Sequence, residues 1–132
     1  MDREVTLPDG PEGASFARRA TARAADLWRL DREMTDTALL LVSEPVTNAI
    51  RHGTPPVRLS LRLDRDRQQR DRLRVEVTDC SPSLPELSQP EPDQIGGRGL
   101  QIVQLLAARW GASASSRRLG KTVWFELSKM LR

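Results

Sequence analysis

The sequence predicts an α+β fold, a two-layer α/β sandwich in which helices cover one face of a mixed, mostly antiparallel sheet. Three observations support this prediction. Apolar and polar residues alternate in several segments that follow one another like hairpins. Two long segments carry apolar residues at helical spacing. The length of 132 residues suits one layered core and is too short for two. We therefore expect a single domain over residues 1–132.

Two helices are expected in the first half of the chain. Residues 12–30 are rich in Ala and Arg, and their apolar members recur with the period of an amphipathic helix. Residues 31–34 are polar and interrupt this pattern. Thr35 is then a suitable N-cap for a second helix that runs to about His52. Gly53 ends that helix, and the two prolines that follow prevent its continuation.

The strands are expected before and after these helices. Residues 4–7 alternate like a short strand and are stopped by a Pro/Gly-rich turn. Residues 57–63 and 73–78 alternate strictly between apolar and polar side chains, as half-buried strands do. The charged stretch 64–72 between them predicts a hairpin with a long solvated turn.

The last third of the chain is expected to contain a loop, a helix and a hairpin. Residues 80–95 include four prolines and no periodic pattern, so we expect a loop whose length suggests a functional role. A helix is predicted from Leu100 to about Arg109. Residues 112–116 and 122–127 are then expected to pair as a terminal hairpin around residues 117–121.

Composition narrows the classes of function. The net charge is +3, and the arginines are scattered rather than gathered into one stripe. With no Tyr and few other aromatics, the sequence argues against direct nucleic-acid binding. Cys80 is the one cysteine, which excludes an intrachain disulfide. The N-terminus lacks the pattern of a signal peptide, and no apolar run reaches membrane-spanning length. We expect a cytoplasmic protein without a membrane segment.

Glu44 and Asn48 lie at positions i and i+4 of the second predicted helix, opposite its apolar side. A carboxylate beside a carboxamide oxygen offers the hard oxygen ligands that Mg²⁺ prefers. The carboxylate can instead orient or deprotonate a nucleophile. The alternative is an exposed polar helix face that only meets solvent, and this pair alone does not decide between them.

Two further features have both a functional and a structural interpretation. Asp79 ends a predicted strand at the mouth of the long loop, where it can accept a hydrogen bond from an amino group such as that of adenine. It can equally form an Asx turn. The glycine cluster 96–99 stands before the Leu100 helix, where backbone N–H groups can approach phosphate oxygens and Arg98 can add a charge-assisted bond. Glycines in such a place can also be ordinary hinges.

Taken together and in order, these segments resemble one ATPase superfamily. The run "LLVSEPVTNAIRHG" at residues 40–53 resembles the N box shared by gyrase, heat-shock chaperone ATPases and histidine kinases. The run "VEVTD" at residues 75–79 resembles the first glycine box, and "GGRGLQIV" at residues 96–103 resembles the second. The closing "GKTVWFEL" at residues 120–127 is similar to the end of the anti-sigma factor serine/threonine kinases. The resemblance covers nearly the whole chain.

The resemblance implies roles for the polar residues of the first two boxes. Glu44 matches the catalytic carboxylate, which acts as general base toward the accepting hydroxyl. Asn48 matches the ligand of Mg²⁺ and contacts the nucleotide through it. Asp79 matches the aspartate that recognises adenine. The implied cofactors are ATP and Mg²⁺.

The resemblance also implies roles in the second half of the chain. Gly97 and Gly99 match the glycines that let the lid backbone pass close to the phosphates. Arg98 and Leu100 begin the helix beneath them. Thr122 falls where the family commonly places a hydroxyl near the nucleotide.

Family resemblance implies protein partners as well. Kinases of this kind phosphorylate a serine on a small antagonist of the anti-sigma factor, and they bind a sigma factor, commonly as homodimers. Pro45 departs from the family pattern, which has an apolar residue in the helix at this position. A proline there removes a backbone hydrogen bond and clashes with the preceding turn, so we expect a kink or break beside Glu44. The alternative function is therefore a non-catalytic switch that binds ATP and a protein partner.

Overall fold

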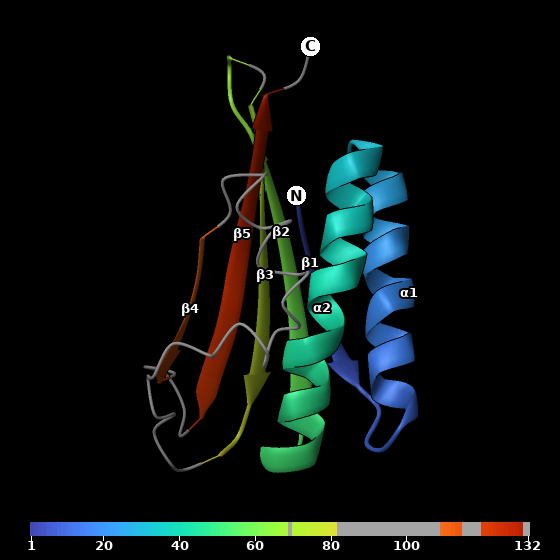
Figure 1. Cartoon of the computed structure of the whole chain (residues 1–132), viewed down its shortest axis with the longest axis vertical. Helices are drawn as coiled ribbons and strands as arrows, with labels where there is room; N and C mark the ends of the chain where they lie inside the picture. Colours follow the sequence, from blue (N-terminus) through green and yellow to red (C-terminus); the bar gives the residue numbers. More distant parts are fainter. Residues whose placement is uncertain (69, 82–108, 115–119, 131–132) are drawn as a thin grey trace.

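The computed structural model describes residues 1–68, 70–81, 109–114 and 120–130. In this part of the chain, five strands form one sheet in the order β1-β2-β3-β5-β4. Each of the four strand pairings is antiparallel. Helices α1 and α2 lie side by side against the same face of the sheet (Figure 1). The predicted α+β two-layer sandwich with helices on one face is confirmed.

Each described element falls close to a segment that the sequence predicts. The elements are β1 (Asp2–Leu7), α1 (Glu12–Leu27), α2 (Arg32–His52), β2 (Val57–Arg65), β3 (Arg70–Asp79), β4 (Arg109–Ala114) and β5 (Lys121–Met130). The helix predicted from Leu100 and most of the loop predicted over residues 80–95 lie outside the described residues. The differences are in the ends of the elements.

Helix α1 ends three residues earlier than predicted, at Leu27. Arg29 adopts a left-handed conformation with φ of 53°. Its N–H donates to the Asp26 carbonyl (3.2 Å), and the Leu30 N–H donates to the Ala25 carbonyl (2.8 Å). These two bonds form a Schellman motif, which satisfies the last carbonyls of a helix. The apolar spacing continues through Trp28, but the backbone has already turned.

The N-cap of helix α2 lies four residues before the predicted N-cap at Thr35, and that prediction is wrong. The N-cap is Asp31, whose Oδ1 accepts a hydrogen bond from the Met34 N–H at 3.1 Å. The Thr35 hydroxyl instead donates to the Asp31 carbonyl (2.9 Å) within the first turn. Asp31 is a strong N-cap residue, and its chemistry outweighs the polar character of the residues that follow.

The core lies between the two layers. Along β2 and β3 every second residue is buried, as the alternation predicts. The buried residues that α1 contributes to the core are small, namely Ala17, Ala20 and Ala24. The largest fully buried side chains of the core include Met34, Leu59, Leu61, Leu63, Leu73 and Leu127.

The hairpin between β2 and β3 is longer and its turn tighter than predicted. The strands extend to Arg65 and resume at Arg70, so much of the charged stretch 64–72 is paired. The Asp66 carboxylate accepts from the N–H groups of Gln68 and Arg70, both at 2.9 Å. Asp71 is completely buried and receives two hydrogen bonds from the Arg65 guanidinium, at 2.6 and 2.9 Å. Paired charges thus occupy strand positions that composition alone assigned to a turn.

The C-terminal hairpin is confirmed with shifted ends. Strand β4 covers residues 109–114 instead of 112–116, and β5 begins at Lys121 and extends three residues beyond the predicted end at Leu127. Arg109, the approximate end of the predicted helix, is the first residue of β4. The shift matters for the site, because it makes Lys121 a strand residue with a defined face.

No helix of the described residues covers the other face of the sheet (Figure 1). Arg74 on this face donates to Glu76 (2.9 Å) and Glu126 (2.6 Å). Its guanidinium carbon lies 4.2 Å from the ring centroid of Trp124. Beneath the same indole is Gly111, where a Cβ atom would lie 2.9 Å from the ring. The indole ring of Trp124 therefore contacts the Arg74 guanidinium and the backbone of Gly111.

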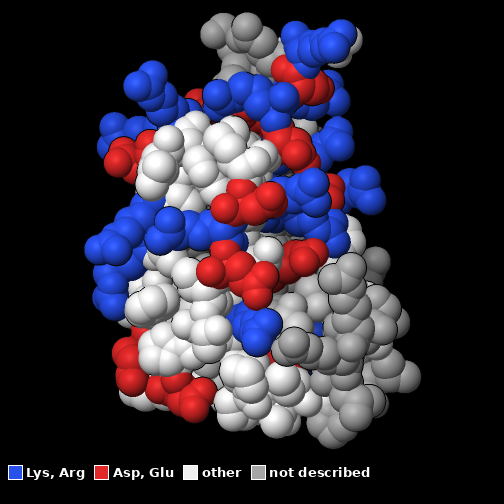
Figure 2. Space-filling view, turned by 180° about the vertical axis from the view of Figure 1, so that it is seen from behind, with Lys and Arg blue, Asp and Glu red and all other residues white. Residues whose placement is uncertain are grey.

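The surface carries mixed charge. Figure 2 shows basic and acidic side chains next to one another on the side seen from behind. Exposed pairs on the first two strands include Arg58 with Glu4 (3.4 Å) and Arg62 with Asp2 (3.6 Å). Among the described residues, no helix is long and apolar enough to cross a bilayer.

Candidate functional site

Helix α2 carries Glu44 and Asn48 one turn apart in its C-terminal half. The Glu44 side chain is half-buried and that of Asn48 is exposed. By helical geometry, Asn48 lies about one and a half turns, and Glu44 about two and a half turns, before Gly53 at the end of the helix. Along the helix axis this places Asn48 roughly 7 Å and Glu44 roughly 13 Å from Gly53, which contacts Asp79.

Pro45 does not break α2. The helix is continuous from Arg32 to His52 with Pro45 inside it. Its neighbours Leu41, Val42 and Val46 are buried in the core. Packing of this apolar face against the sheet offsets the backbone hydrogen bond that proline removes. The predicted break beside Glu44 is absent, and Glu44 is presented from a helical backbone.

Asp79 ends β3 and is only 2% exposed. Its Oδ1 accepts a hydrogen bond from the Ser81 N–H at 2.6 Å, which is the Asx turn that the sequence allowed. Its Oδ2 lies 3.7 Å from the Nζ of Lys121. The turn and a ligand-binding role are compatible, because the turn occupies one carboxylate oxygen and leaves lone pairs on the other.

Two glycines lie against Asp79, Gly53 at its side chain and Gly120 at its backbone. At Gly53, a Cβ atom would lie 2.6 Å from both the Ala49 carbonyl oxygen and the Asp79 carboxyl carbon. At Gly120, a Cβ atom would overlap the Asp79 carbonyl oxygen. Such distances are far inside van der Waals contact, so any side chain would displace its neighbours. The end of α2, the end of β3 and the start of β5 thus meet at Asp79.

A backbone hydrogen bond adds to this junction. The Cys80 N–H donates to the Thr54 carbonyl at 2.8 Å. The segment that leaves α2 is thereby tied to the segment that leaves β3. The position of Asp79 is set by backbone contacts and does not depend on flexible side chains, which is what a precise recognition site requires.

Thr122 is not brought together with Asp79. In the antiparallel register, Asp79 is opposite Lys121, and Thr78 is opposite Thr122. The two threonine hydroxyls are hydrogen-bonded at 2.9 Å on the face that no described helix covers. Because successive strand residues point to opposite faces, it is Lys121 that shares the face of Asp79.

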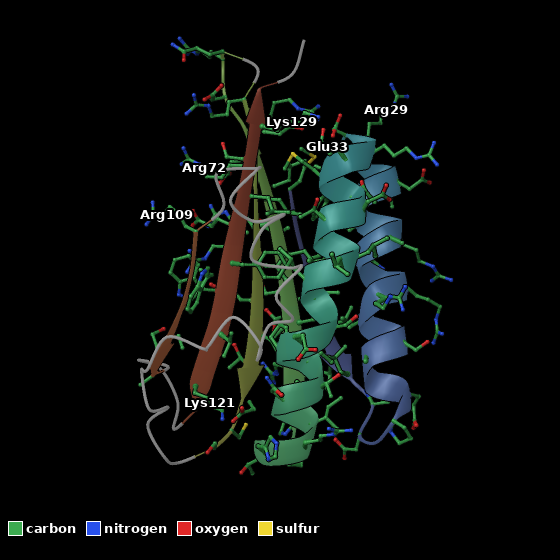
Figure 3. All side chains as sticks on the ribbon, viewed as in Figure 1. Arg29, Glu33, Arg72, Arg109, Lys121 and Lys129 are labelled. Atoms are coloured by element: carbon green, nitrogen blue, oxygen red, sulfur yellow. The ribbon has the colours of Figure 1, made fainter. Side chains whose placement is uncertain are left out.

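Lys121 lies beside Asp79, and the sequence did not predict this position. Its side chain is 21% exposed and lies next to a carboxylate that is almost fully buried. The lysine is labelled in Figure 3, at the lower end of β5. A signal was available, since Lys121 precedes the apolar position Val123 by two residues and so belongs to the same face of the strand. The family pattern instead indicated Thr122, the residue next to Lys121.

The predicted phosphate-binding residues lie outside the described part of the chain. They are Gly97, Arg98, Gly99 and Leu100. The site described here is therefore the portion formed by α2, β3 and β5. It contains the candidate base-recognition residue and the two candidate residues for Mg²⁺ and proton transfer.

The available donors fit a magnesium ion that arrives with a nucleotide. No three His, Cys, Asp or Glu side chains come together as a metal site among the described residues. Mg²⁺ at such sites keeps several waters and takes phosphate oxygens, so it needs only one or two protein ligands. The exposed carboxamide of Asn48 and the nearby Glu44 carboxylate offer oxygens of the right kind.

Comparison with known proteins identifies the family. The family model described as the histidine kinase-like ATPase domain matches residues 7–127. The chain belongs to this family. The match spans Glu44, Asn48, Asp79 and the glycine cluster, so it includes the whole candidate site. This histidine kinase-like ATPase domain is accordingly an ATP-binding domain, as its sequence predicts.

Solved structures agree on the fold. The chain is similar to the histidine kinase domain of the blue-light activated histidine kinase EL346 from Erythrobacter litoralis, with a TM-score of 0.54 and 22% identity. That similarity covers 86% of this chain and 59% of the other. A second structure of the Erythrobacter kinase gives a TM-score of 0.51 with 25% identity, over 93% of this chain and 47% of the other. The ATPase domain is thus shorter than these kinases.

A further match is the mycobacterial sensor histidine kinase MprB, with a TM-score of 0.50 and 13% identity. It covers 98% of this chain and 100% of the other. At this identity the likeness concerns the fold alone. A search among curated protein sequences found no match.

Proposed function

We propose that this ATPase domain is a Mg·ATP-dependent serine/threonine protein kinase of the anti-sigma factor type. In this proposal it transfers the γ-phosphate to a serine or threonine of an antagonist protein and also binds a sigma factor, which implies a cytoplasmic location. The observation that carries the proposal is Asp79, a buried carboxylate fixed by Gly53 and Gly120 at the end of the helix that bears Glu44. A homodimer is the expected assembly.

Asp79 is suited to bind the base because its carboxylate is shielded from water and held in one position. Its Oδ1 is engaged by the Ser81 N–H, which leaves Oδ2 to accept from an exocyclic amino group. A hydrogen bond to a buried charged acceptor is stronger than one in water. Since the carboxylate is fixed before the ligand arrives, little entropy is lost when this bond forms.

Glu44 is suited to accept a proton. In the transfer step the hydroxyl oxygen of the substrate attacks the γ-phosphorus, the bond from this phosphorus to the β-bridging oxygen breaks, and ADP leaves. The hydroxyl proton passes to the Glu44 carboxylate. Mg²⁺, held by phosphate oxygens and Asn48, would neutralise charge on the phosphates. The half-buried position of Glu44 leaves its carboxylate reachable from the surface.

Calorimetric titration tests nucleotide binding directly. We expect the wild-type chain to bind ATP, with tighter binding when Mg²⁺ is present. Asp79→Asn should weaken binding by roughly 10- to 100-fold, the range for a hydrogen bond to a charged group. Asp36→Asn changes an exposed aspartate of α2 and serves as the matched control. If the wild-type chain shows no binding at millimolar ATP, or the Asp79 variant binds as tightly as wild type, the proposed site is wrong.

A transfer assay tests the kinase activity. Labelled ATP is incubated with the domain and candidate antagonist proteins, and phosphoserine or phosphothreonine is detected on the acceptor. We expect Glu44→Ala to abolish transfer while ATP affinity stays near the wild-type value, because Glu44 acts on the proton and not on the base. Equal transfer by wild type and Glu44→Ala would contradict the assigned role.

The alternative function is a non-catalytic switch in which ATP sets the surface that a protein partner binds. Pro45 is the observation that favours it, since the residue beside the candidate base lacks a helical hydrogen bond. Pro45→Leu distinguishes the two functions. For a kinase limited by local helix geometry, transfer should rise in this variant. Tight ATP binding without transfer in both wild type and Pro45→Leu would support the switch.

A further inference from the structure

Lys121 occupies an unusual position for a lysine. It is opposite Asp79 in the register of β3 and β5 and shares its face of the sheet. Its side chain is 21% exposed, and its Nζ lies 3.7 Å from Asp79 Oδ2. This distance exceeds a hydrogen bond, and the ammonium makes no hydrogen bond to any described residue. The ammonium therefore has N–H donors available for a ligand next to the Asp79 carboxylate.

A second lysine of the same strand shows what a structural role looks like. Lys129 is on the same face and donates to Asp31 at 3.1 Å and to Glu33 at 2.6 Å. Its bonds tie β5 to the first turn of α2. Lys121 has no comparable pair of partners in the described part of the chain, so tethering of elements does not explain it.

The carboxylate and the ammonium present complementary hydrogen-bonding groups. Asp79 Oδ2 is an acceptor, held in place by the turn to Ser81 and by the close approach of Gly53. Lys121 Nζ is a donor next to it. On the Watson–Crick edge of adenine, the 6-amino group donates and the adjacent ring nitrogen N1 accepts. A carboxylate alone matches only the amino group and leaves N1 to water.

We propose that Lys121 recognises the base together with Asp79. The Asp79 carboxylate accepts from the 6-amino group of adenine, and the Lys121 ammonium donates to N1. This inference rests on the proposed nucleotide site and adds a residue that determines base specificity. The present distance of 3.7 Å leaves the ammonium attracted to the carboxylate but free to turn toward a base.

The proposed hydrogen bond between Lys121 and N1 is tested by changing the nucleotide and the lysine in turn. Calorimetric titrations compare ATP with 1-deaza-ATP, in which N1 is replaced by a C–H group, for wild type and Lys121→Met. Wild type should bind 1-deaza-ATP roughly 10- to 100-fold more weakly than ATP, the range for a hydrogen bond to a charged group. In Lys121→Met the two nucleotides should bind within about 3-fold of each other, because the donor that distinguishes them is gone.

Two further variants complete the test. Lys121→Arg keeps a cationic donor and should retain most of the preference for ATP. This variant still tests the role of the cation if Lys121→Met does not fold. Lys129→Met removes the other lysine of this face and should keep the wild-type preference. Equal binding of both nucleotides by wild type, or an undiminished preference in Lys121→Met, overturns the role of Lys121 while leaving the ATP site intact. Absence of ATP binding by wild type overturns the proposed function itself.

Discussion

The two ends of β5 carry similar groups in different states. At one end, Lys129 is hydrogen-bonded to Asp31 and Glu33, and all three side chains are partly exposed. At the other end, Lys121 lies 3.7 Å from Asp79, which is 2% exposed. Figure 3 labels Lys129, Glu33 and Lys121 and shows the two lysines far apart along the strand. At one end the lysine is hydrogen-bonded to both carboxylates, and at the other end the lysine lies beside a buried carboxylate without a hydrogen bond to it.

This difference distinguishes a structural contact from the candidate recognition site. The partners of Lys129, Asp31 and Glu33, are partly exposed to solvent, and exposed pairs of this kind add little to stability. Asp79 is positioned by backbone, through Gly53, Gly120 and the turn to Ser81. Holding a charge in a buried place is costly, and a buried carboxylate held by backbone contacts beside a cation is typical of a ligand-binding position.

The largest effect is expected from filling the space beside Asp79. Gly53 has a φ of −90°, which suits alanine, so Gly53→Ala acts only through its contacts. The added methyl group meets the Ala49 carbonyl and the Asp79 carboxylate. We expect a loss of about 1–3 kcal/mol in the free energy of unfolding, as for other overpacked sites, and at least a 10-fold loss of ATP affinity. Urea unfolding and calorimetry measure the two effects.

Gly10→Ala is the matched control for this prediction. Gly10 has a φ of 91°, but a Cβ atom there would be 3.6 Å from its nearest neighbour, the flexible Glu12 side chain. The variant should lose about 1–2 kcal/mol through backbone strain and keep its ATP affinity. If both alanine variants retain ATP affinity, the glycine contact does not position Asp79.

An intermediate effect is expected at the other end, from the cap of α2. Asp31→Ala removes the side chain that accepts from the Met34 N–H, and we expect a loss of about 1 kcal/mol. Asp31→Asn keeps a good N-cap and removes only the charge that faces Lys129, so its loss at neutral pH should be smaller. Urea unfolding of both variants separates capping from ion pairing. Equal losses would show that the charge, and not the cap, dominates.

The smallest effect is the pH dependence at this end. Burial alone would raise the pKa of Asp31, but the hydrogen bond from the Met34 N–H and the nearby Lys129 ammonium together lower its pKa below the ordinary value of 3.8. A lowered pKa in the folded state means that ionised Asp31 stabilises the fold above pH 3.8, and that this contribution is lost as the pH falls through the folded pKa. Asp31→Asn should therefore lose less stability than wild type on acidification.

Urea midpoints between neutral and strongly acidic pH check this expectation. The ATP affinity of Asp31→Asn at neutral pH should equal that of wild type, because the two ends of the sheet are independent. An acid dependence identical to that of wild type would exclude Asp31 as a contributor.

The fold was predictable because its pattern is local. Strict alternation along β2 and β3 placed both strands, and helical spacing placed α1 and α2. The ends of the two helices were less predictable, because each helix cap depends on one or two specific hydrogen bonds. Arg29 takes a left-handed conformation that sequence favours only weakly, and Asp31 was hidden among other polar residues.

The candidate site was predictable only in part. Glu44, Asn48 and Asp79 were predicted as site residues from the order of the motifs, which is a property of the sequence. The role of Lys121 depends on its register opposite Asp79, across strands that are far apart in the chain. Register is set by the packing of the whole sheet, so spacing along the sequence does not reveal it. The contact of Gly53 with Asp79 has the same origin, although its place at the end of the helix was predicted.

The layered indole of Trp124 gives the molecule an optical probe. The chain has three tryptophans and no tyrosine, and Trp28 and Trp110 pack against the core. With phenylalanine at those two positions, all tryptophan emission would come from the ring between Arg74 and Gly111. The wavelength of its emission maximum, and the extent to which a dissolved quencher reduces the emission, would then report whether β4 stays paired with β5. The exposed face of the sheet could thus be observed in solution while the nucleotide site fills on the opposite face.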